Sequence, residues 1–122
     1  MTASVLRVLL VDDEVLIAYE MAETLEELGF EVVGPCLRLE EAEKRAGADE
    51  IDVALLDVNL GRGKTSETVA AILRERGVPL VFMTAYDREQ VAFVKDDDML
   101  LRKPVIGAAL GETLANRLAT DR

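Results

Sequence analysis

Histidine and tryptophan are absent from the 122 residues, and cysteine occurs once, at Cys36. Without histidine, the chain has no imidazole base, no histidine metal ligand and no phosphohistidine of its own. One cysteine cannot form an internal disulfide, which favours a cytoplasmic location. Aromatic residues make up only 4% of the chain, so the hydrophobic core must be mainly aliphatic.

Long apolar runs and excess positive charge are lacking as well. No run approaches the roughly 18 residues needed to span a bilayer, and residues 1–4 lead into a strand-like run without a signal-peptide pattern. The net charge of −10 disfavours direct binding to nucleic acid or to an anionic membrane. We expect protein partners or cations, and a single domain over residues 1–122, with its core at about 5–119 and no output domain.

Apolar runs alternate with helical patterns along the chain. The expected strands cover residues 5–11, 31–34, 52–56, 80–83 and 99–102, and the expected helices cover 14–28, 39–46, 65–76 and about 106–118. In the first helix, Ile17, Met21, Leu25 and Leu28 form the predicted inward face. Residues 87–94 leave room for one or two helical turns, so the fourth helix is expected to be short or poorly ordered. The alternation predicts an α/β fold, a flavodoxin-like doubly wound five-stranded parallel sheet of order 2-1-3-4-5.

Polar residues stand at the ends of four of these strands. Asp12 and Asp13 follow the first strand, Asp57 ends the third, Thr84 ends the fourth and Lys103 follows the fifth. The carboxyl ends of parallel strands lie at one edge of the sheet, where ligands bind in open α/β folds. We therefore expect the five side chains to converge, with Asp57 solvated enough to stay ionised and exposed enough to react.

This set of residue types favours phosphoryl transfer. Three carboxylates in one crevice repel one another unless a cation joins them, and hard oxygen ligands suit Mg²⁺. Lys103 supplies a mobile positive charge and Thr84 a hydroxyl donor, so Asp57 is the predicted nucleophile that forms an acyl phosphate. Singly, each residue has a plainer explanation: the acidic pair could begin a helix, Lys103 could be a surface lysine and Thr84 could satisfy backbone.

With these residues in these positions, the chain resembles a response-regulator receiver domain of a two-component system, a CheY-like fold, over almost its whole length. The resemblance implies that a histidine kinase or histidine phosphotransfer protein phosphorylates Asp57. It implies that Asp12, Asp13, Asp57 and the main-chain carbonyl of Asn59 hold Mg²⁺. It also implies a peptide bond before Pro104 that is usually cis.

The sequence departs from the common receiver pattern in three places. Leu100 stands where many receivers carry an aromatic switch residue, and the interval from Thr84 to Lys103 is 19 residues, a few fewer than expected. The loop after Asp57 has residues 61–63, Gly-Arg-Gly, where a proline is common.

Residues 79–86 resemble the Pro-Phe-x-Phe-Ala-Thr-Gly-Tyr motif of receivers, often stand-alone, found in alphaproteobacteria. Leu80, Met83 and Ala85 depart from that motif. Tyr86 is a candidate replacement for the missing aromatic switch, or simply a loop tyrosine.

The resulting hypothesis is a stand-alone regulator, monomeric or weakly dimeric, that signals through an unknown downstream protein or acts as a phosphate shuttle or sink. It is not expected to be an enzyme beyond its own phosphotransfer and autodephosphorylation. A haloacid-dehalogenase-type phosphatase is one alternative, although its nucleophile follows the first strand in an Asp-x-Asp pattern. A pseudo-receiver interaction module is another. A flavodoxin-like electron carrier fits poorly, because the acids after the first strand would repel FMN phosphate.

Overall fold

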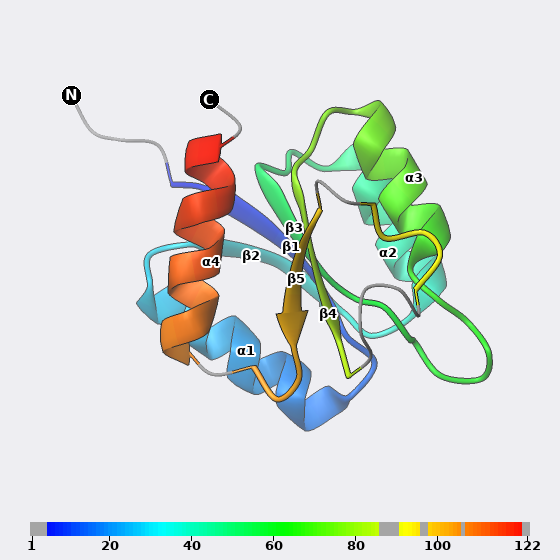
Figure 1. Ribbon diagram of the computed structural model, residues 1–122, viewed down its shortest axis with the longest axis horizontal. Helices are drawn as coiled ribbons and strands as arrows, with labels where there is room; N and C mark the ends of the chain where they lie inside the picture. The colour runs from blue at the N-terminus through cyan, green and yellow to red at the C-terminus, as the bar shows by residue number, and fades with distance from the viewer. Residues whose placement is uncertain (1–4, 86–90, 96–97, 106, 121–122) are drawn as a thin grey trace.

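One parallel sheet, covered by helices on both faces, forms the centre of the molecule (Figure 1). The computed structural model describes residues 5–85, 91–95, 98–105 and 107–120. Its strands are β1 (Arg7–Val11), β2 (Glu31–Cys36), β3 (Val53–Asp57), β4 (Leu80–Thr84) and β5 (Met99–Arg102). Its helices are α1 (Val15–Glu27), α2 (Leu39–Ala48), α3 (Glu67–Glu75) and α4 (Gly107–Thr120). The strand order is β2-β1-β3-β4-β5, with every neighbouring pair parallel, so the predicted fold is confirmed.

The core has two halves, one on each face of the sheet. Helices α1 and α4 lie on one side and α2 and α3 on the other (Figure 1). Successive side chains of β3 alternate between the halves: Ala54 and Leu56 pack toward α2 and α3, and Val53 and Leu55 toward α1 and α4. All of β3 is buried, as expected for a central parallel strand with both faces covered. Asp57 is thereby held at the end of a rigid strand.

Helix α1 buries a different stripe from the one predicted. Met21 and Leu25 are buried, but Ile17 is 39% exposed and Leu28 is 47% exposed. The small residues Ala18 and Ala22 complete the buried face with Met21 and Leu25, so this face is turned away from Ile17. Leu28 is the C-cap residue, beyond the last helical turn. The first turn of α1 therefore presents apolar side chains to solvent.

Strand β2 continues beyond its predicted end at Gly34. It reaches Cys36 through a cis Gly34–Pro35 peptide, and its register against β1 shifts between Leu9 and Val11. A proline is tolerated here because β2 is an edge strand. Gly34 has φ +111°, and a Cβ there would lie 2.6 Å from the Cys36 nitrogen, so only glycine fits.

The connection between β4 and β5 is held against α3. The predicted helical turns at 87–94 lie partly outside the described residues, and residues 91–95 form a turn without helix. Arg74 of α3 donates to the Phe93 carbonyl at 3.1 Å and pairs with the buried Asp98. Its guanidinium lies 5.8 Å from the centre of the Phe82 ring, which packs edge-on against Phe93. In the described part of the chain, no helix has the length and apolarity that a membrane span requires.

Candidate functional site

The predicted polar residues meet at the carboxyl edge of the sheet. Asp12 directly follows β1, and its main-chain nitrogen donates to the Cys36 carbonyl at 3.1 Å. Asp57 and Thr84 are the last residues of β3 and β4. Lys103 follows β5, where its nitrogen donates to the Thr84 carbonyl at 2.9 Å. These main-chain hydrogen bonds fix the positions of the Cα atoms from which the side chains of the site project.

Lys103 is the centre of an ion-pair cluster. Its Nζ lies 2.9 Å from Asp57 Oδ2, 3.3 Å from Glu14 Oε1 and 3.9 Å from Asp12 Oδ2. Carboxylate oxygens of Asp12, Asp13 and Asp57 lie within 4.8 Å of one another. One ammonium group thus faces a cluster of acidic groups, which leaves a large excess of negative charge for a further cation to neutralise.

The crevice around these groups has a volume of about 400 Å³. It is lined by Asp13, Glu14, Asp57, Asn59, Gly61, Thr84, Ala85 and Lys103. Asp57 is only 3% exposed and Asp12 is fully buried. Asp57 is therefore less solvated than expected, because neighbouring elements close around the strand end, and the crevice is its approach.

Burial changes the ionisation of the cluster. It raises the pKa of Asp57 to about 7; the hydrogen bond from Lys103 opposes the rise and the charge of Asp12 adds to it. Burial also raises the pKa of Asp12, against the Glu14 main-chain N–H and the Lys103 charge. Burial lowers the pKa of Lys103, but its bond to Asp57 and the acidic charges outweigh that effect and leave the pKa raised. The expectation that Asp57 simply stays ionised therefore leaves out the cost of its burial, which favours the neutral form of the carboxyl in the metal-free protein.

The acidic cluster has the features of a divalent-cation site. Asp12 Oδ1 accepts from the Glu14 nitrogen at 3.0 Å, whereas Oδ2 is buried and has no hydrogen-bond partner among the described residues. A buried carboxylate oxygen left without a hydrogen bond is costly unless a cation takes it. Together with Asp13 and Asp57 it forms an all-oxygen donor set, which suits Mg²⁺.

The loop after β3 closes one wall of the crevice. Asn59 lines it and pairs with Thr65 in an isolated antiparallel bridge. Gly61 has φ +78°, and a Cβ there would lie 3.0 Å from Asp13 Oδ2. Glycine at position 61 therefore lets the backbone approach the acidic cluster closely.

Strand β5 and the residues that follow it form the side of the crevice that carries Lys103. The Lys103–Pro104 peptide is cis, as the resemblance implied. Leu100 is half-buried and packs against the core half that contains Phe82 and Phe93. Tyr86, the candidate switch residue, lies outside the described residues.

Sequence reasoning overlooked Glu14 as part of the site. It was assigned only to the start of the first helix, yet its main chain contacts Asp12 and its carboxylate contacts Lys103. The available signal was its position directly after the acidic pair. The contact itself joins residues 89 positions apart and could not be predicted from spacing.

Comparisons with known proteins agree with this geometry. Residues 8–114 match the family described as the response regulator receiver domain. The chain is 34% identical over 119 residues to the transcriptional regulatory protein BtsR of Escherichia coli, covering 96% of this chain and 49% of BtsR. It is 33% identical over 85 residues to the transcriptional regulatory protein PdtaR of Mycobacterium tuberculosis, covering 70% of this chain and 42% of PdtaR. The chain spans about half the length, or less, of these curated relatives.

Solved structures show the same fold. A response regulator receiver protein from Sinorhizobium medicae superposes with a TM-score of 0.86 at 22% identity, covering 99% of this chain and 100% of that one. A CheY-like receiver domain protein from Methanospirillum hungatei gives a TM-score of 0.85 at 25% identity, covering 97% of each chain. Receiver domains are the signalling phosphoacceptors of two-component systems. The match to this family favours a receiver over the alternative of a haloacid-dehalogenase-type phosphatase. From its fold, its acidic crevice and the match over residues 8–114, the chain belongs to the response regulator receiver domain family.

Proposed function

We propose that Asp57 accepts a phosphoryl group from a phosphohistidine of a histidine kinase or histidine phosphotransfer protein. The observation that carries this proposal is the position of Asp57 at the bottom of the crevice, 2.9 Å from Lys103 and beside the Asp12 oxygen that accepts no hydrogen bond from the described residues. An Asp57 oxygen forms the new bond to phosphorus while the phosphorus–nitrogen bond breaks, and the electron pair returns to the imidazole of the donor. Lys103 and Thr84 engage the phosphoryl oxygens.

Asp12, Asp13, Asp57 and the main-chain carbonyl of Asn59 would hold Mg²⁺. When bound, the ion supplies neutralisation of the negative charge on the transferring group. The buried Asp12 oxygen without a hydrogen bond from the described residues and the clustered acidic oxygens support this assignment. Mg²⁺ binding also separates the proposal from the pseudo-receiver alternative, which predicts no such binding.

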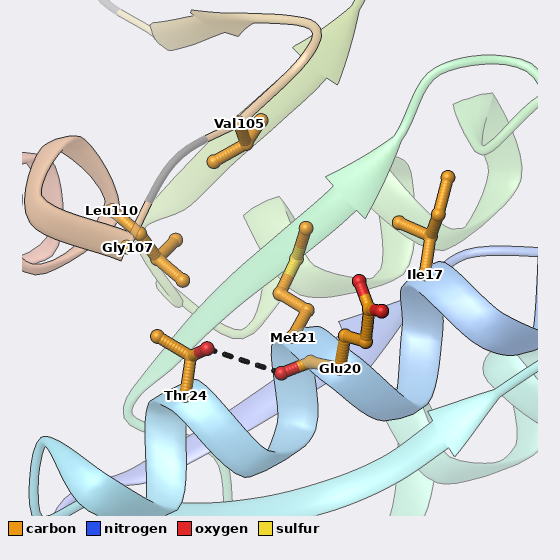
Figure 2. Close-up of a pocket in the computed structure, with 7 residues that line it drawn as sticks. All are labelled: Ile17, Glu20, Met21, Thr24, Val105, Gly107 and Leu110. Carbon is orange, nitrogen blue, oxygen red and sulfur yellow. Dashed lines mark hydrogen bonds between the residues drawn. The ribbon is translucent and has the colours of Figure 1, made fainter.

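The start of α1 is the surface that we propose for docking the phosphodonor protein. Val15, Leu16 and Tyr19 are 53%, 81% and 56% exposed, directly after the crevice residue Glu14. Figure 2 shows the neighbouring groove, where Ile17, Glu20, Met21 and Thr24 of α1 face Val105, Gly107 and Leu110. An adjoining cavity carries this apolar surface on to Lys103 and Pro104. Since Asp57 is nearly buried, a protein donor must sit closely against this rim to reach it.

We further propose that this receiver acts without an output domain. Likeness to the Phe-Ala-Thr-Gly-Tyr subgroup supports a stand-alone receiver, with Tyr86 reporting the state of Asp57 to a downstream protein. The curated relatives are about twice as long as this chain, so the length of the native polypeptide in cells is the test of that arrangement. Turnover of a phosphomonoester would instead favour the phosphatase alternative.

Phosphorylation with acetyl phosphate and Mg²⁺ tests the central step. Wild-type protein should gain one phosphoryl group by intact-mass measurement, and hydroxylamine should remove it, as expected for an acyl phosphate. Asp57→Asn should gain none, whereas Asp49→Asn, at the end of α2, should label like wild type. Equal labelling of Asp57→Asn would reject Asp57 as the acceptor.

A further inference from the structure

Glu14 connects two members of the site that lie on different elements. Its main-chain nitrogen donates to Asp12 Oδ1 at 3.0 Å, and its Oε1 lies 3.3 Å from Lys103 Nζ. The Glu14 side chain is 54% exposed, whereas that of Asp57 is 5% exposed. Lys103 therefore bridges a carboxylate at the bottom of the crevice and another at its mouth.

A divalent cation in the acidic cluster would conflict with this arrangement. Lys103 Nζ occupies a position 2.9 Å from an oxygen of Asp57, which is also a proposed ligand of the ion. Two cations that share one carboxylate repel each other strongly in a partly buried site. The flexible stem of lysine allows its ammonium group to move. Among the described carboxylates lining the crevice, Glu14 alone lies outside the proposed metal set.

We infer that Glu14 is a positioning residue for Lys103, whose ammonium it retains at the crevice mouth when a divalent cation binds beside Asp57. Without the Glu14 carboxylate, Lys103 keeps Asp57 as its strongest partner and competes with the cation. The inference rests on the proposed Mg²⁺ site and assigns a role to a residue that the receiver resemblance left without one.

A double-mutant cycle on Mg²⁺ affinity tests the inference. Mg²⁺ dissociation constants are measured by isothermal titration calorimetry for wild type, Glu14→Gln, Lys103→Met and the double variant. A KCl concentration of about 0.3 M damps the long-range effect of losing an exposed charge. In the wild-type background, Glu14→Gln should weaken Mg²⁺ binding about threefold, the scale of an exposed ion pair. In the Lys103→Met background it should have little effect.

The cycle separates positioning from a simple charge effect. Equal weakening in both backgrounds would mean that Glu14 acts on the ion directly, and the inference would be wrong; no weakening in either would also overturn it. Glu23→Gln, the same charge change on the exposed side of α1, should leave the affinity unchanged. Lys103→Gln provides a second background if Lys103→Met does not fold by circular dichroism.

The measurement uses no phosphodonor, so it is independent of phosphorylation. A coupled cycle with no labelling of Asp57 would reject the phosphoacceptor and retain the role of Glu14. An additive cycle with normal labelling would do the reverse. Wild-type protein that binds no Mg²⁺ would overturn both the proposed metal site and this inference.

Discussion

At the scale of single residues, Asp57 is an acid kept in an unfavourable place. It is 3% exposed and shares its crevice with Asp12, and among the described residues Lys103 offsets the cost of its charge. Its folded-state pKa of about 7 exceeds the ordinary value of 3.8 for an aspartate side chain. Folding stability from this group is therefore present below pH 3.8 and is lost as pH rises through about 7. In the proposed mechanism, the ionised carboxylate is the form of Asp57 that binds the cation and attacks phosphorus.

Asp57→Asn should stabilise the metal-free protein at neutral pH. The amide carries no charge to desolvate, and its oxygen can still accept from Lys103. We expect a gain of about 1–3 kcal/mol in the free energy of unfolding at pH 7.5 in EDTA. Urea denaturation at pH 5 and pH 7.5 checks this, since the advantage of the variant should shrink at the lower pH. A variant less stable than wild type at pH 7.5 would contradict the conclusion that the buried charge of Asp57 destabilises the folded protein.

At the scale of elements, the β4–β5 connection and the start of α1 lie on opposite sides of the crevice. The β4–β5 connection is tied to α3 through Arg74, which binds the Phe93 carbonyl and pairs with Asp98. Asp98 also accepts from the Lys95 nitrogen at 2.7 Å. Leu100 packs into the same region in place of the usual aromatic switch. The start of α1, on the other side of the crevice, is apolar and exposed.

Asp98→Ala should destabilise the fold. The substitution leaves the Arg74 guanidinium, whose side chain is 25% exposed, without its carboxylate, and it removes the acceptor of the Lys95 N–H. We expect a loss of about 2–3 kcal/mol, measured by urea denaturation. Asp49→Ala breaks the more exposed pair with Arg45 and should cost less than about 1 kcal/mol. Equal losses in the two variants would mean that the Arg74 contact does not secure the connection.

Leu16→Ser should impair phosphotransfer from a protein donor without affecting chemistry at Asp57. Leu16 is 81% exposed, so folding stability should hardly change, while a docked partner would lose a central apolar contact. The initial rate should fall about tenfold with the histidine kinase that labels wild type fastest in a phosphotransfer profile. Labelling by acetyl phosphate should not change. Val5→Ser, an exposed apolar residue just before β1 and away from the carboxyl edge, is the matched control. Parallel losses with both donors would rule out docking at α1.

At the scale of the whole molecule, charge and topology act together. With a net charge of −10, the acidic groups of the folded protein repel one another and lower its stability. The strand order places some of these acidic groups together at one edge of the sheet. β1 and β3 are neighbours, so the acids that follow them come close even though they are far apart in sequence. Screening by any salt, and specific binding of a cation, both relieve this repulsion.

Mg²⁺ should therefore stabilise the protein beyond the effect of ionic strength. In 10 mM MgCl₂ we expect the Tm to rise by several degrees relative to KCl of matched ionic strength, about 1–3 kcal/mol for a ligand well above its Kd. Asp12→Asn removes a buried ligand and should abolish the difference between the two salts. An equal Tm in both salts for wild type would show that only screening operates.

The sequence by itself determined the order of strands and helices and the edge at which Asp12, Asp13, Asp57, Thr84 and Lys103 meet. Such prediction works because a residue at the end of a parallel strand is placed by hydrogen-bond register, whatever surrounds it. Turn residues and the spacing of apolar residues are local properties, so they predict the positions of helices and strands from the sequence alone.

Only the tertiary structure decided how buried these residues are and which partners they share. The pKa of Asp57, the contact between Glu14 and Lys103, and the pairing of Arg74 with Asp98 depend on distances between segments far apart in sequence. The buried stripe of α1 was likewise decided by how closely Ala18 and Ala22 let that helix approach the sheet. Burial and electrostatics arise from packing in three dimensions, and spacing along the chain does not encode them directly.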